Sequence, residues 1–488
     1  MMELPFETEE KETAPPLDAI NEKIKNVFGR LAIDKRRLPM SQLQKKGIPA
    51  YVGEWLLDSI VPGDGPLSKE EAAKVQNWVA RFLPGPSDAN AIKNRLLAGE
   101  IVKVLTSVQV EVILKRKRRE RIARMSLLDI QDAFINDDII EKYPDLLNQG
   151  MWGVVELIST DEGVRLISFK PMQASVNLSL YKEARKAFSL AEWRHLMLIS
   201  MGYNPYYFTE KEQLLLLGRL LPLTQKSMHM MELAPKGTGK SYIYENISPR
   251  VRLVSGGNVS PAVLFINNST GQWGLLARYA VVVLDEVQTL KFEKPHEIIG
   301  GLKGFLANGR LTRGGLHETS SDSSLVLLAN ILLDERQQPL RELLVEELPP
   351  FLQETAFLDR IKALTPGWEI RKLSSKSFAQ GVGLKSDFFG DALLALREDL
   401  DHDQFVARKI TLTGRNVYKR NADAVLAIAS GYMKILFPDG QVSDEDFDRY
   451  CVQPAVKLRQ NIWKQLQILD GEYRQYDSRI GYEINPDA

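Results

Sequence analysis

Cysteine, histidine and long apolar runs are all scarce in this chain of 488 residues. One cysteine, Cys451, and five histidines exclude a disulfide framework, and they argue against a cysteine-based zinc site or a dedicated metal cage. The strongest apolar candidate, residues 214–217, is broken at once by Gly218 and Arg219, far short of the ~18–20 residues that a membrane-spanning helix needs. The first residues are acidic and lack the basic-then-apolar order of a signal peptide. We therefore expect a cytoplasmic protein with no membrane partner.

An excess of charge of one sign is also lacking. The 63 basic and 63 acidic residues cancel to a net charge of zero, which excludes a uniformly basic nucleic-acid binder. A local basic segment stays open, because contacts with phosphate depend on the local potential. With 44% hydrophobic and 26% charged residues, wholesale disorder is excluded. The length suggests about two to four domains.

Changes of residue pattern along the chain predict its organisation. Apolar residues recur at helical spacing before residue 100, and apolar side chains recur at every second position from Val108 to Leu114. In order, we expect a loose tail (1–16), an N-terminal helical domain (17–100), a small β-rich module (101–178), a helical linker (179–222), an α/β core (223–375), a lid containing helices only (376–465) and a polar C-terminal tail (466–488).

The expected core contains three largely apolar strands, at Met228–Leu233, Ala280–Leu284 and Ser324–Ala329. Strands that are apolar at every position are those buried on both faces, as in a parallel α/β sheet. A further strand-like segment, Trp368–Ile370, follows. This pattern predicts an α/β fold for the core.

A phosphate-binding loop follows the first of these strands and opens an expected helix at Tyr242–Asn246. Its residues are Ala234, Pro235, Lys236, Gly237, Thr238, Gly239, Lys240 and Ser241. Small residues let backbone N–H groups turn toward phosphate oxygens at a helix N-terminus. Lys240 would reach the β- and γ-phosphates of ATP, and Ser241 would hold Mg²⁺. The alternative, a chance Gly-Thr-Gly loop, does not explain the Lys-Ser ending after a strand.

Ala234 is the one departure from the usual phosphate-loop pattern, which has glycine at this position. Alanine restricts φ, so we expect Ala234 to adopt an ordinary L-residue backbone conformation.

A second strand delivers two carboxylates, Asp285 and Glu286, at its end. In a parallel sheet this places them at the edge where ligands bind. Asp285 would orient Mg²⁺, and Glu286 would polarise the attacking water. Alone, such a pair is an ordinary solvated strand end. Downstream of a phosphate loop, it indicates ATP hydrolysis.

Three further residues fit roles in a ring-shaped ATPase. Asn330 ends the third strand and would position the hydrolytic water. Arg360 would complete a neighbouring subunit's site by offsetting charge on the transferred phosphoryl group, and Arg415 would reach the γ-phosphate from the lid. The alternatives are a polar core asparagine and surface arginines, and Arg336 and Arg341 compete for the role in the neighbour's site.

Many short motifs resemble those of one family. They are Ala234–Ser241, Ser255-Gly256-Gly257, Ala262–Phe265, Leu284-Asp285-Glu286, Leu302–Phe305 and Arg313-Gly314, with Phe28-Gly29, Met151-Trp152-Gly153, Phe169–Met172 and Met201–Pro205 upstream. Over nearly all of residues 17–440 the chain resembles the BrxL family, the Lon-related AAA+ proteins of the BREX bacteriophage-exclusion systems.

The resemblance implies an AAA+ P-loop sheet with a helical lid, similar to minichromosome-maintenance helicases. It also implies a hexameric ring, single or double, that acts on double-stranded DNA with other BREX defence proteins to block phage replication. The family name refers to a C-terminal domain like that of Lon protease. The chain ends soon after the lid helices, so we expect that domain to be absent and expect no peptidase activity.

Two basic segments are candidates for DNA contact. Seven of the ten residues at 115–124 are basic, and a basic strand or hairpin suits phosphate contact without base readout. The second segment has two arginines beside a Gly-Gly turn, where helicase-like AAA+ rings carry a hairpin that points into the channel. The candidate residues are Lys115, Arg116, Lys117, Arg118, Arg119, Arg121, Arg310 and Arg313. The alternatives are a solvated charged face and a simple hairpin connection.

The function that these patterns favour is a DNA-binding AAA+ ATPase that couples ATP hydrolysis to DNA engagement or translocation in defence against phage. One alternative is a protein unfoldase ring acting with a protease, which would need an aromatic pore loop. Tyr279 and Phe265 are poor candidates for such a loop. Another is a nucleotide-gated DNA clamp that does not translocate, and its motifs would be the same as those of a motor.

Overall fold

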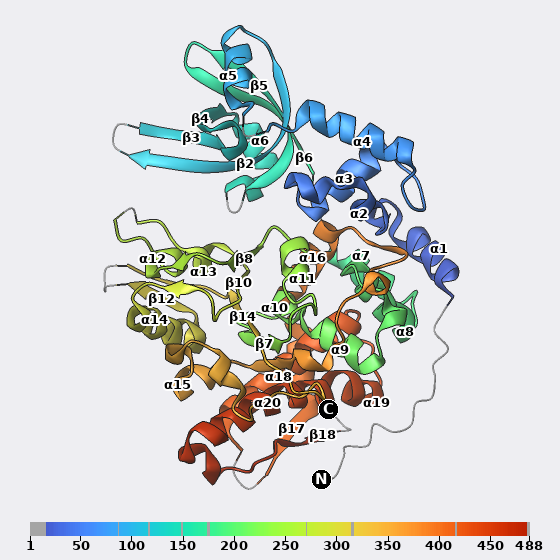
Figure 1. The fold of residues 1–488 in the computed structure, drawn as a ribbon, viewed down its shortest axis with the longest axis vertical. Coiled ribbons are helices and arrows are strands. Elements are labelled where there is room, and N and C mark those ends of the chain that lie inside the picture. Colours follow the sequence, from blue (N-terminus) through green and yellow to red (C-terminus); the bar gives the residue numbers. More distant parts are fainter. Residues whose placement is uncertain are drawn as a thin grey trace.

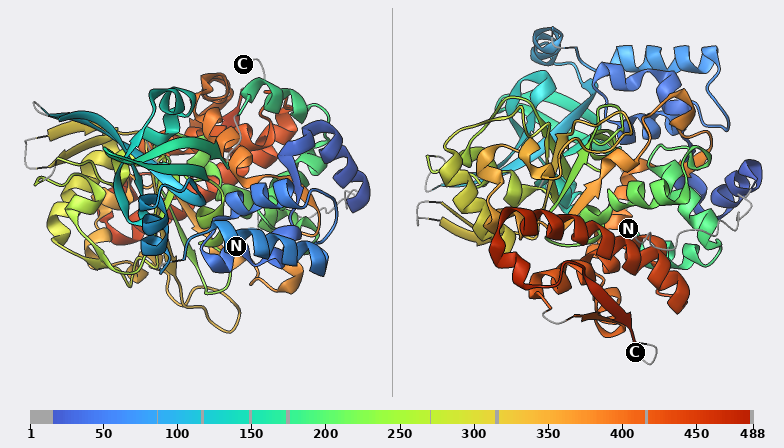
Figure 2. Two further views of the ribbon diagram at one scale, coloured as in Figure 1. Left: turned by 90° about the horizontal axis from the view of Figure 1, so that it is seen from above. Right: turned by 60° about the horizontal axis from the view of Figure 1, so that its bottom comes forward.

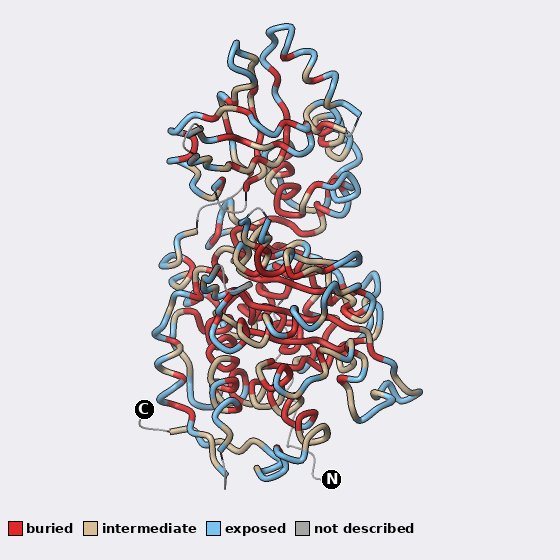
Figure 3. The backbone as a smooth tube through the Cα atoms, turned by 90° about the vertical axis from the view of Figure 1, so that its left-hand side faces the viewer, coloured by how far each residue is buried: buried red, intermediate tan, exposed pale blue. Residues whose placement is uncertain are grey.

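The computed structural model describes residues 16–85, 87–115, 118–147, 150–172, 176–269, 271–313, 317–414 and 417–485. The chain forms two lobes stacked along the long axis, an N-terminal lobe and a larger body (Figure 1). Each lobe has its own buried interior, as the burial colouring in Figure 3 shows. No helix within the described ranges is both long and apolar enough to cross a membrane.

A closed β-barrel forms half of the N-terminal lobe. Its strands are β2 (Val102–Lys115), β3 (Arg118–Met125), β4 (Ile130–Ile135), β5 (Met151–Thr160) and β6 (Gly163–Pro171), paired in the order β2-β3-β4-β6-β5. Val104, Val108 and Val110 of β2 point into its interior, where α5 (Ala89–Leu97) and α6 (Asp137–Lys142) also pack. The outer ends of β2 and β3 continue beyond the barrel as a hairpin arm.

Helices form the other half of this lobe. They are α2 (Arg37–Ser41), α3 (Ala50–Ile60) and α4 (Lys69–Phe82). α4 begins with a capping box, in which Ser68 and Glu71 satisfy each other's backbone N–H groups. Val52 and Leu56 of α3 and Val75 of α4 share one apolar core with Leu105 and Val154 of the barrel. The helices and the barrel are therefore packed as one unit.

The body is built on a five-stranded parallel sheet. In spatial order its strands are β15 (Ala363–Pro366), β7 (Met230–Ala234), β14 (Ser324–Asn330), β10 (Val281–Asp285) and β8 (Val251–Ser255). Val281 and Val283 face one apolar core, while Val282 and Leu284 face another. Because both faces are covered, the inner strands of the sheet are apolar at most positions.

Helices cover both faces of this sheet (Figures 1 and 2). On one face pack α1 (Leu17–Phe28), α7 (Leu178–Arg185), α8 (Leu190–Ser200), α9 (Glu210–Gly218), α10 (Leu221–Thr224), α11 (Tyr242–Asn246), α16 (Ser386–Ala395), α17 (Leu400–Lys409), α18 (Lys419–Leu436) and α19 (Asp444–Phe447). On the other pack α12 (Pro261–Leu264), α13 (Leu275–Arg278), α14 (Pro295–Asn308) and α15 (Thr355–Leu358). α20 (Gln453–Leu469) contributes to both cores.

Several segment assignments made from the sequence are wrong. Residues 179–222 are not a linker, because α7 to α10 are buried in the body. The lid region is not helical throughout, since it contains β16 (Val382–Leu384) and β17 (Ile410–Thr413). The C-terminal segment is not a loose tail, because β18 (Gly481–Ile484) pairs with β17.

Two N-terminal and core assignments also need correction. α1 packs on the body through Ile20 and Ile24, and β1 (Ala32–Asp34) pairs with β16, so residues 17–34 belong to the body. Trp368–Ile370 is not a strand: a 3₁₀ turn covers Gly367–Glu369, and β15 lies just before it. Short segments of this kind depend on distant partners, which local periodicity does not reveal.

Polar contacts join the N-terminal lobe to the body close to α11. The indole Nε1 of Trp55 in α3 donates to Asp387 in α16 at 2.7 Å. The amide of Gln44 donates to Asn246, the last residue of α11, at 2.8 Å. The helix that follows the phosphate loop therefore contacts the N-terminal lobe directly.

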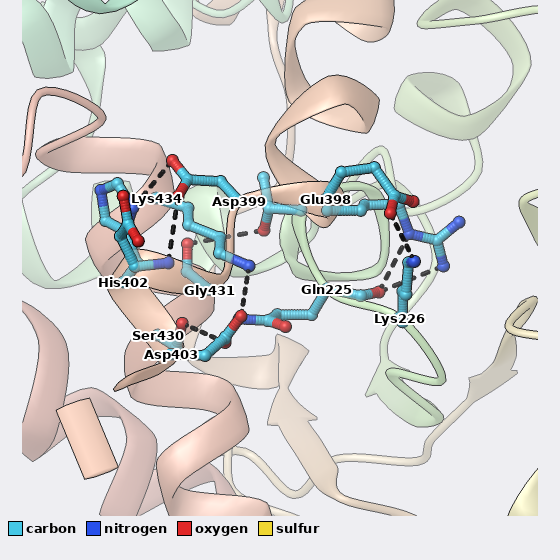
Figure 4. A network of polar contacts seen from close by, with 12 residues as sticks. Gln225, Lys226, Glu398, Asp399, His402, Asp403, Ser430, Gly431 and Lys434 are labelled. Atoms are coloured by element: carbon cyan, nitrogen blue, oxygen red, sulfur yellow. Dashed lines mark hydrogen bonds and ion pairs between the residues drawn. The ribbon is translucent and has the colours of Figure 1, made fainter. Parts of the chain in front are cut away.

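A buried polar network ties α17 and α18 to the segment that precedes β7 (Figure 4). Asp403 accepts hydrogen bonds from Gln225 at 2.8 Å, Ser430 at 2.6 Å and Lys434 at 2.9 Å. Burial alone would raise the pKa of Asp403, but these three donors outweigh it and lower the pKa. Burial lowers the pKa of Lys434, whose side chain is fully enclosed.

We expect Asp403→Asn to lower the free energy of unfolding at pH 7 by about 1–3 kcal/mol, because the buried ammonium of Lys434 would be left without its partly exposed counter-ion. The lowered pKa means that the carboxylate stabilises the fold above its unfolded pKa of about 3.9, and that this stability is lost as the pH falls through the folded pKa. The difference between variant and wild type should therefore shrink at acid pH in thermal unfolding curves.

The control is a double-mutant cycle with Lys434→Met, which removes the buried ammonium. Asp403→Asn should cost much less in that background. An equal cost with and without Lys434, or a cost that does not shrink as the pH falls well below about 3.9, would contradict the ion-pair explanation.

Candidate nucleotide-binding site

The phosphate loop lies between β7 and α11, at the carboxyl edge of the parallel sheet. Gly237 and Gly239 have φ angles of +88° and +71°, which other residues rarely adopt. Ala234 ends β7 and is not among the residues with positive φ, so the expectation of an ordinary conformation there is confirmed. Gly367 packs directly against the methyl group of Ala234, and a methyl group added to Gly367 would overlap it. At this contact, glycine is therefore needed at position 367 and not at position 234.

Lys240 is almost fully buried at the end of the loop, with 7% of its surface exposed. Its Nζ donates to Oδ1 of Asn330 at 2.7 Å. Asn330 ends β14 and lies directly opposite Ala234 in the parallel pair. Burial lowers the pKa of Lys240, while the carboxylates of Glu232, Asp285 and Glu286 oppose the shift.

Ser241 and Asp285 meet beside the loop. The Ser241 hydroxyl donates to Oδ2 of Asp285 at 2.8 Å. A hydroxyl and a carboxylate are oxygen ligands of the kind that Mg²⁺ uses in nucleotide sites, with phosphate and water completing the shell. In the part of the chain that the structure describes, no cluster of three or more His, Cys, Asp or Glu side chains forms a separate metal site. The pair therefore fits Mg²⁺ bound together with a nucleotide.

Glu286 has a strained backbone, with a φ of +47°. Its N–H donates to Oδ1 of Asp285 at 2.9 Å, and its carbonyl accepts from the N–H of Thr289 at 2.7 Å. Non-glycine residues in this conformation are uncommon and concentrate at functional sites. The turn directs the chain away from the sheet just after the two carboxylates.

A buried ion pair beneath the loop was not predicted from the sequence. Arg219, which follows α9, pairs with Glu232 in the middle of β7 at 2.6 Å. A charged residue inside the otherwise apolar segment Met230–Ala234 was the available signal, because carboxylates are almost never fully buried without a partner.

Comparison with protein families and known proteins gives a consistent answer. Residues 164–479 match the family model "Lon-like protease BrxL-like, ATPase domain". Residues 26–158 match the model "BREX system Lon protease-like protein BrxL N-terminal". The chain belongs to the BrxL family. The resemblance seen in the sequence motifs is thereby confirmed.

Curated BrxL proteins are similar over most of this chain. Lon-like protease BrxL of Escherichia coli O9:H4 (strain HS) is 29% identical over 445 residues, covering 89% of this chain and 63% of the relative. That of Bacillus cereus (strain H3081.97) is 29% identical over 449 residues, covering 90% and 65%. This chain thus spans just under two thirds of their length. A solved full-length MCM homolog from Methanopyrus kandleri aligns with a TM-score of 0.38 and 12% identity, covering 87% of this chain and 100% of that one.

Of the two arginines predicted for this site, the structure describes only Arg360. Arg415 lies outside the described residues. Arg360 donates to the carbonyl of Ala356, and among the described contacts none joins it to the loop. Its neighbour Asp359 is held by Arg459 at 3.3 Å and by Arg420, which ties the end of α15 to the helices α18 and α20.

Two other arginines compete with Arg360 for the role in a neighbouring subunit's site. Arg341 pairs with Glu346, and the backbone N–H of Arg336 donates to Asp334.

The basic candidates that the structure describes lie on two pairs of antiparallel strands. Arg116 and Lys117 fall outside the described residues, and the side chains of Lys115, Arg118 and Arg313 are not described. Arg119 is exposed on β3, and Arg121 pairs with Asp137. Arg310 begins β12 (Arg310–Arg313), is 59% exposed, and pairs with Glu318 of β13 (His317–Ser320) at 2.8 Å.

We expect Lys240→Ala to weaken nucleotide binding by about 10- to 100-fold, because a charge-assisted hydrogen bond contributes about 1.5–3 kcal/mol. Titration with a fluorescent ATP analogue measures the effect. Lys240→Arg, which keeps the charge but changes the shape, should recover part of the affinity. Lys291→Ala, on the exposed end of β11 (Lys291–Phe292), is the control, and a similar weakening in that variant would contradict a specific role for Lys240.

Proposed function

We propose that this BrxL-family protein is a DNA-binding AAA+ ATPase that forms a ring and couples ATP hydrolysis to DNA engagement in defence against phage. The observation that supports it best is the junction of Lys240, Asn330, Ser241 and Asp285 at one edge of the sheet. The family's membership of BREX systems supports other BREX proteins as partners.

Each residue at the junction has a role in this proposal. Lys240 binds the β- and γ-phosphates of ATP, and Asn330, which holds Lys240 at 2.7 Å, orients the attacking water. Ser241 and Asp285 hold Mg²⁺, which would offset the negative charge on the phosphates. Glu286 accepts a proton from the attacking water. It directly follows the metal ligand Asp285, and its backbone is strained.

A ring would complete each site with an arginine from the neighbouring subunit. Arg360 is the candidate, because its described contact is only with its own helix. Asp359 beside it is anchored to the lid helices α18 and α20. A neighbour's nucleotide that contacts Arg360 would therefore also affect the position of these helices. We propose a hexamer, in which every site lies between two subunits.

The two basic hairpins support DNA as the partner. In Figure 1 and in the left view of Figure 2, the β2–β3 arm and the β12–β13 hairpin project from the same side of the molecule. Phosphate contacts of arginine and lysine are sequence-independent. In a ring, hairpins on one side of each subunit would form two stacked circles around a central duplex.

The alternative of a protein unfoldase finds less support. Phe265 is 2% exposed and packs in the core of the body, and Tyr279 is half-buried against the same core. Neither offers an exposed aromatic pore loop. A DNA clamp that does not translocate uses the same residues as a motor, and the experiment below separates the two.

We expect Glu286→Gln to keep ATP binding and to abolish hydrolysis, because the amide preserves shape but cannot accept the proton. Turnover should fall by at least about 100-fold, the lower end of general-base contributions. The measurement is ATP turnover with and without duplex DNA, together with translocation on the same duplex. DNA-stimulated turnover without movement would identify a clamp.

Mixing two inactive variants tests whether each site in the ring combines residues from two subunits. Glu286→Gln subunits and Arg360→Ala subunits should each be inactive alone but form some active sites together, since each site combines residues from two subunits. No recovery of activity on mixing, with both variants folded, would rule out a shared site that uses Arg360.

Charge reversal of the arm should weaken DNA binding and leave basal ATP turnover intact. The variant carries glutamate at Lys115, Arg116, Lys117, Arg118 and Arg119. On duplex DNA, the slope of log affinity against log salt should become shallower by roughly 0.9 for each phosphate that the protein no longer neutralises. A salt titration on two unrelated duplexes measures it and should show little sequence preference.

A control variant reverses three other exposed cations, Lys69, Lys74 and Arg81, all on α4, which lies away from the arm in Figure 1. This variant should bind DNA like the wild type. If the arm variant also retains wild-type affinity and slope, the DNA-binding role shifts to Arg310 and Arg313.

A further inference from the structure

The ion pair beneath the phosphate loop is fully enclosed by protein. Arg219 is 0% exposed and Glu232 is 1% exposed. The carboxylate accepts from Nη2 at 2.6 Å and from Nε at 3.0 Å. Burial would lower the pKa of Arg219, but Glu232 and the buried tyrosines around it raise it, so the guanidinium stays charged. A buried pair is often no more stabilising than apolar side chains of the same size, which points to a role beyond stability.

The remaining donors of Arg219 reach the loop itself. Nη2 donates to the carbonyl of Thr238 at 3.2 Å, and Nη1 donates to the carbonyl of Gly239 at 3.3 Å. Nη1 also donates to the hydroxyl of Tyr203 at 2.9 Å, and that hydroxyl donates to the same Gly239 carbonyl at 3.2 Å. Two consecutive carbonyls of the loop are thus held toward the interior.

The orientation of these carbonyls fixes two donors on the opposite side. In a trans peptide the C=O and the following N–H point in opposite directions, and no cis peptide occurs in the described ranges. The N–H groups of Gly239 and Lys240 therefore point away from Arg219, toward the open side of the loop. Phosphate loops bind phosphate oxygens through backbone N–H groups that point outward in this way.

Arginine suits this position better than lysine does. Its planar fork offers five donors in fixed directions, so it can bind Glu232 with two of them and still reach the loop and Tyr203. A lysine ammonium has three donors on a flexible stem and would satisfy the carboxylate without holding both carbonyls.

We propose that Arg219 is a positioning residue for nucleotide binding: anchored by Glu232 and Tyr203, it holds two peptide groups of the phosphate loop with their N–H groups toward the phosphates. The inference rests on the proposed function, in which the loop binds ATP. It adds three residues outside the loop motif, after α9, on β7 and on the turn after α8, as determinants of affinity.

The test separates affinity from stability. Arg219→Met alone would leave Glu232 buried without a partner, so the main variant is Arg219→Met with Glu232→Met, which removes both charges and keeps apolar bulk. Two quantities are measured: the melting temperature without nucleotide, and the dissociation constant for a fluorescent ATP analogue with Mg²⁺. We expect a melting temperature near that of the wild type and at least a 10-fold weaker dissociation constant.

Two milder variants grade the effect. Arg219→Lys keeps the charge beside Glu232 and should weaken binding to an intermediate degree, and Tyr203→Phe, which removes one hydrogen bond to Gly239, should weaken it a few-fold. The control replaces a pair within the N-terminal lobe, Arg37 of α2 and Glu71 of α4 at 3.3 Å, with methionines. Nucleotide affinity should not change in that variant.

The outcomes distinguish a failure of nucleotide binding by the protein from a failure of the positioning role of Arg219. If the wild type binds no nucleotide, the proposed function fails. If the wild type binds and the double-methionine variant folds and binds equally well, Arg219 is only structural and this inference is overturned. Should that variant not fold, wild-type affinity in both Arg219→Lys and Tyr203→Phe would overturn it as well.

Discussion

Parallel pairing of β7 with β14, in register with β10, is the constraint on which the candidate site depends. Because the strands run the same way, their carboxyl ends meet at one edge, and residues nearly a hundred positions apart in sequence come within hydrogen-bond distance, as Lys240 and Asn330 do. The register is specified by burial on both faces, since a slip of one residue would exchange the two cores. The geometry of the site is therefore a consequence of packing far from it.

Buried charge recurs at the points where the body must hold a defined arrangement. Arg219 and Glu232 lie under the phosphate loop, and Asp403 and Lys434 lie where the lid helices meet the segment before β7. Such pairs cost desolvation, but they permit few alternative packings, because each charge must find its partner. Apolar cores alone tolerate many rearrangements.

The N-terminal lobe is joined to the body through specific polar contacts as well as through the chain. The contact between Gln44 and Asn246 reaches the helix that follows the phosphate loop, and Asp145 beside the barrel pairs with Arg250 at the start of β8 at 3.3 Å. A change at the nucleotide would act on a lobe that carries a basic arm. In the proposed ring, these contacts would transmit changes during ATP hydrolysis from the body to the lobe that binds DNA.

Local features of the site followed from the sequence because their physics is local. The loop from Ala234 to Ser241, the short helix at Tyr242–Asn246 and the carboxylates after the apolar strand all depend on near neighbours, and the structure has α11 at the predicted residues. The roles of Glu286, Asn330 and Arg360 in hydrolysis stay predictions. The strands were placed within about two residues for the same reason, since continuous apolar runs mark burial on both faces.

Only the tertiary structure decided what depends on distant partners. The pairing of β1 with β16 and of β17 with β18 joins segments whose local patterns show no strand, and α7 to α10 are core helices rather than a linker because a sheet face far along the chain needs cover. Arg219 shows the limit most clearly. By sequence it follows a leucine-rich helix, yet its side chain lies beneath a loop twenty residues later, because a buried cation goes where its carboxylate and acceptors are.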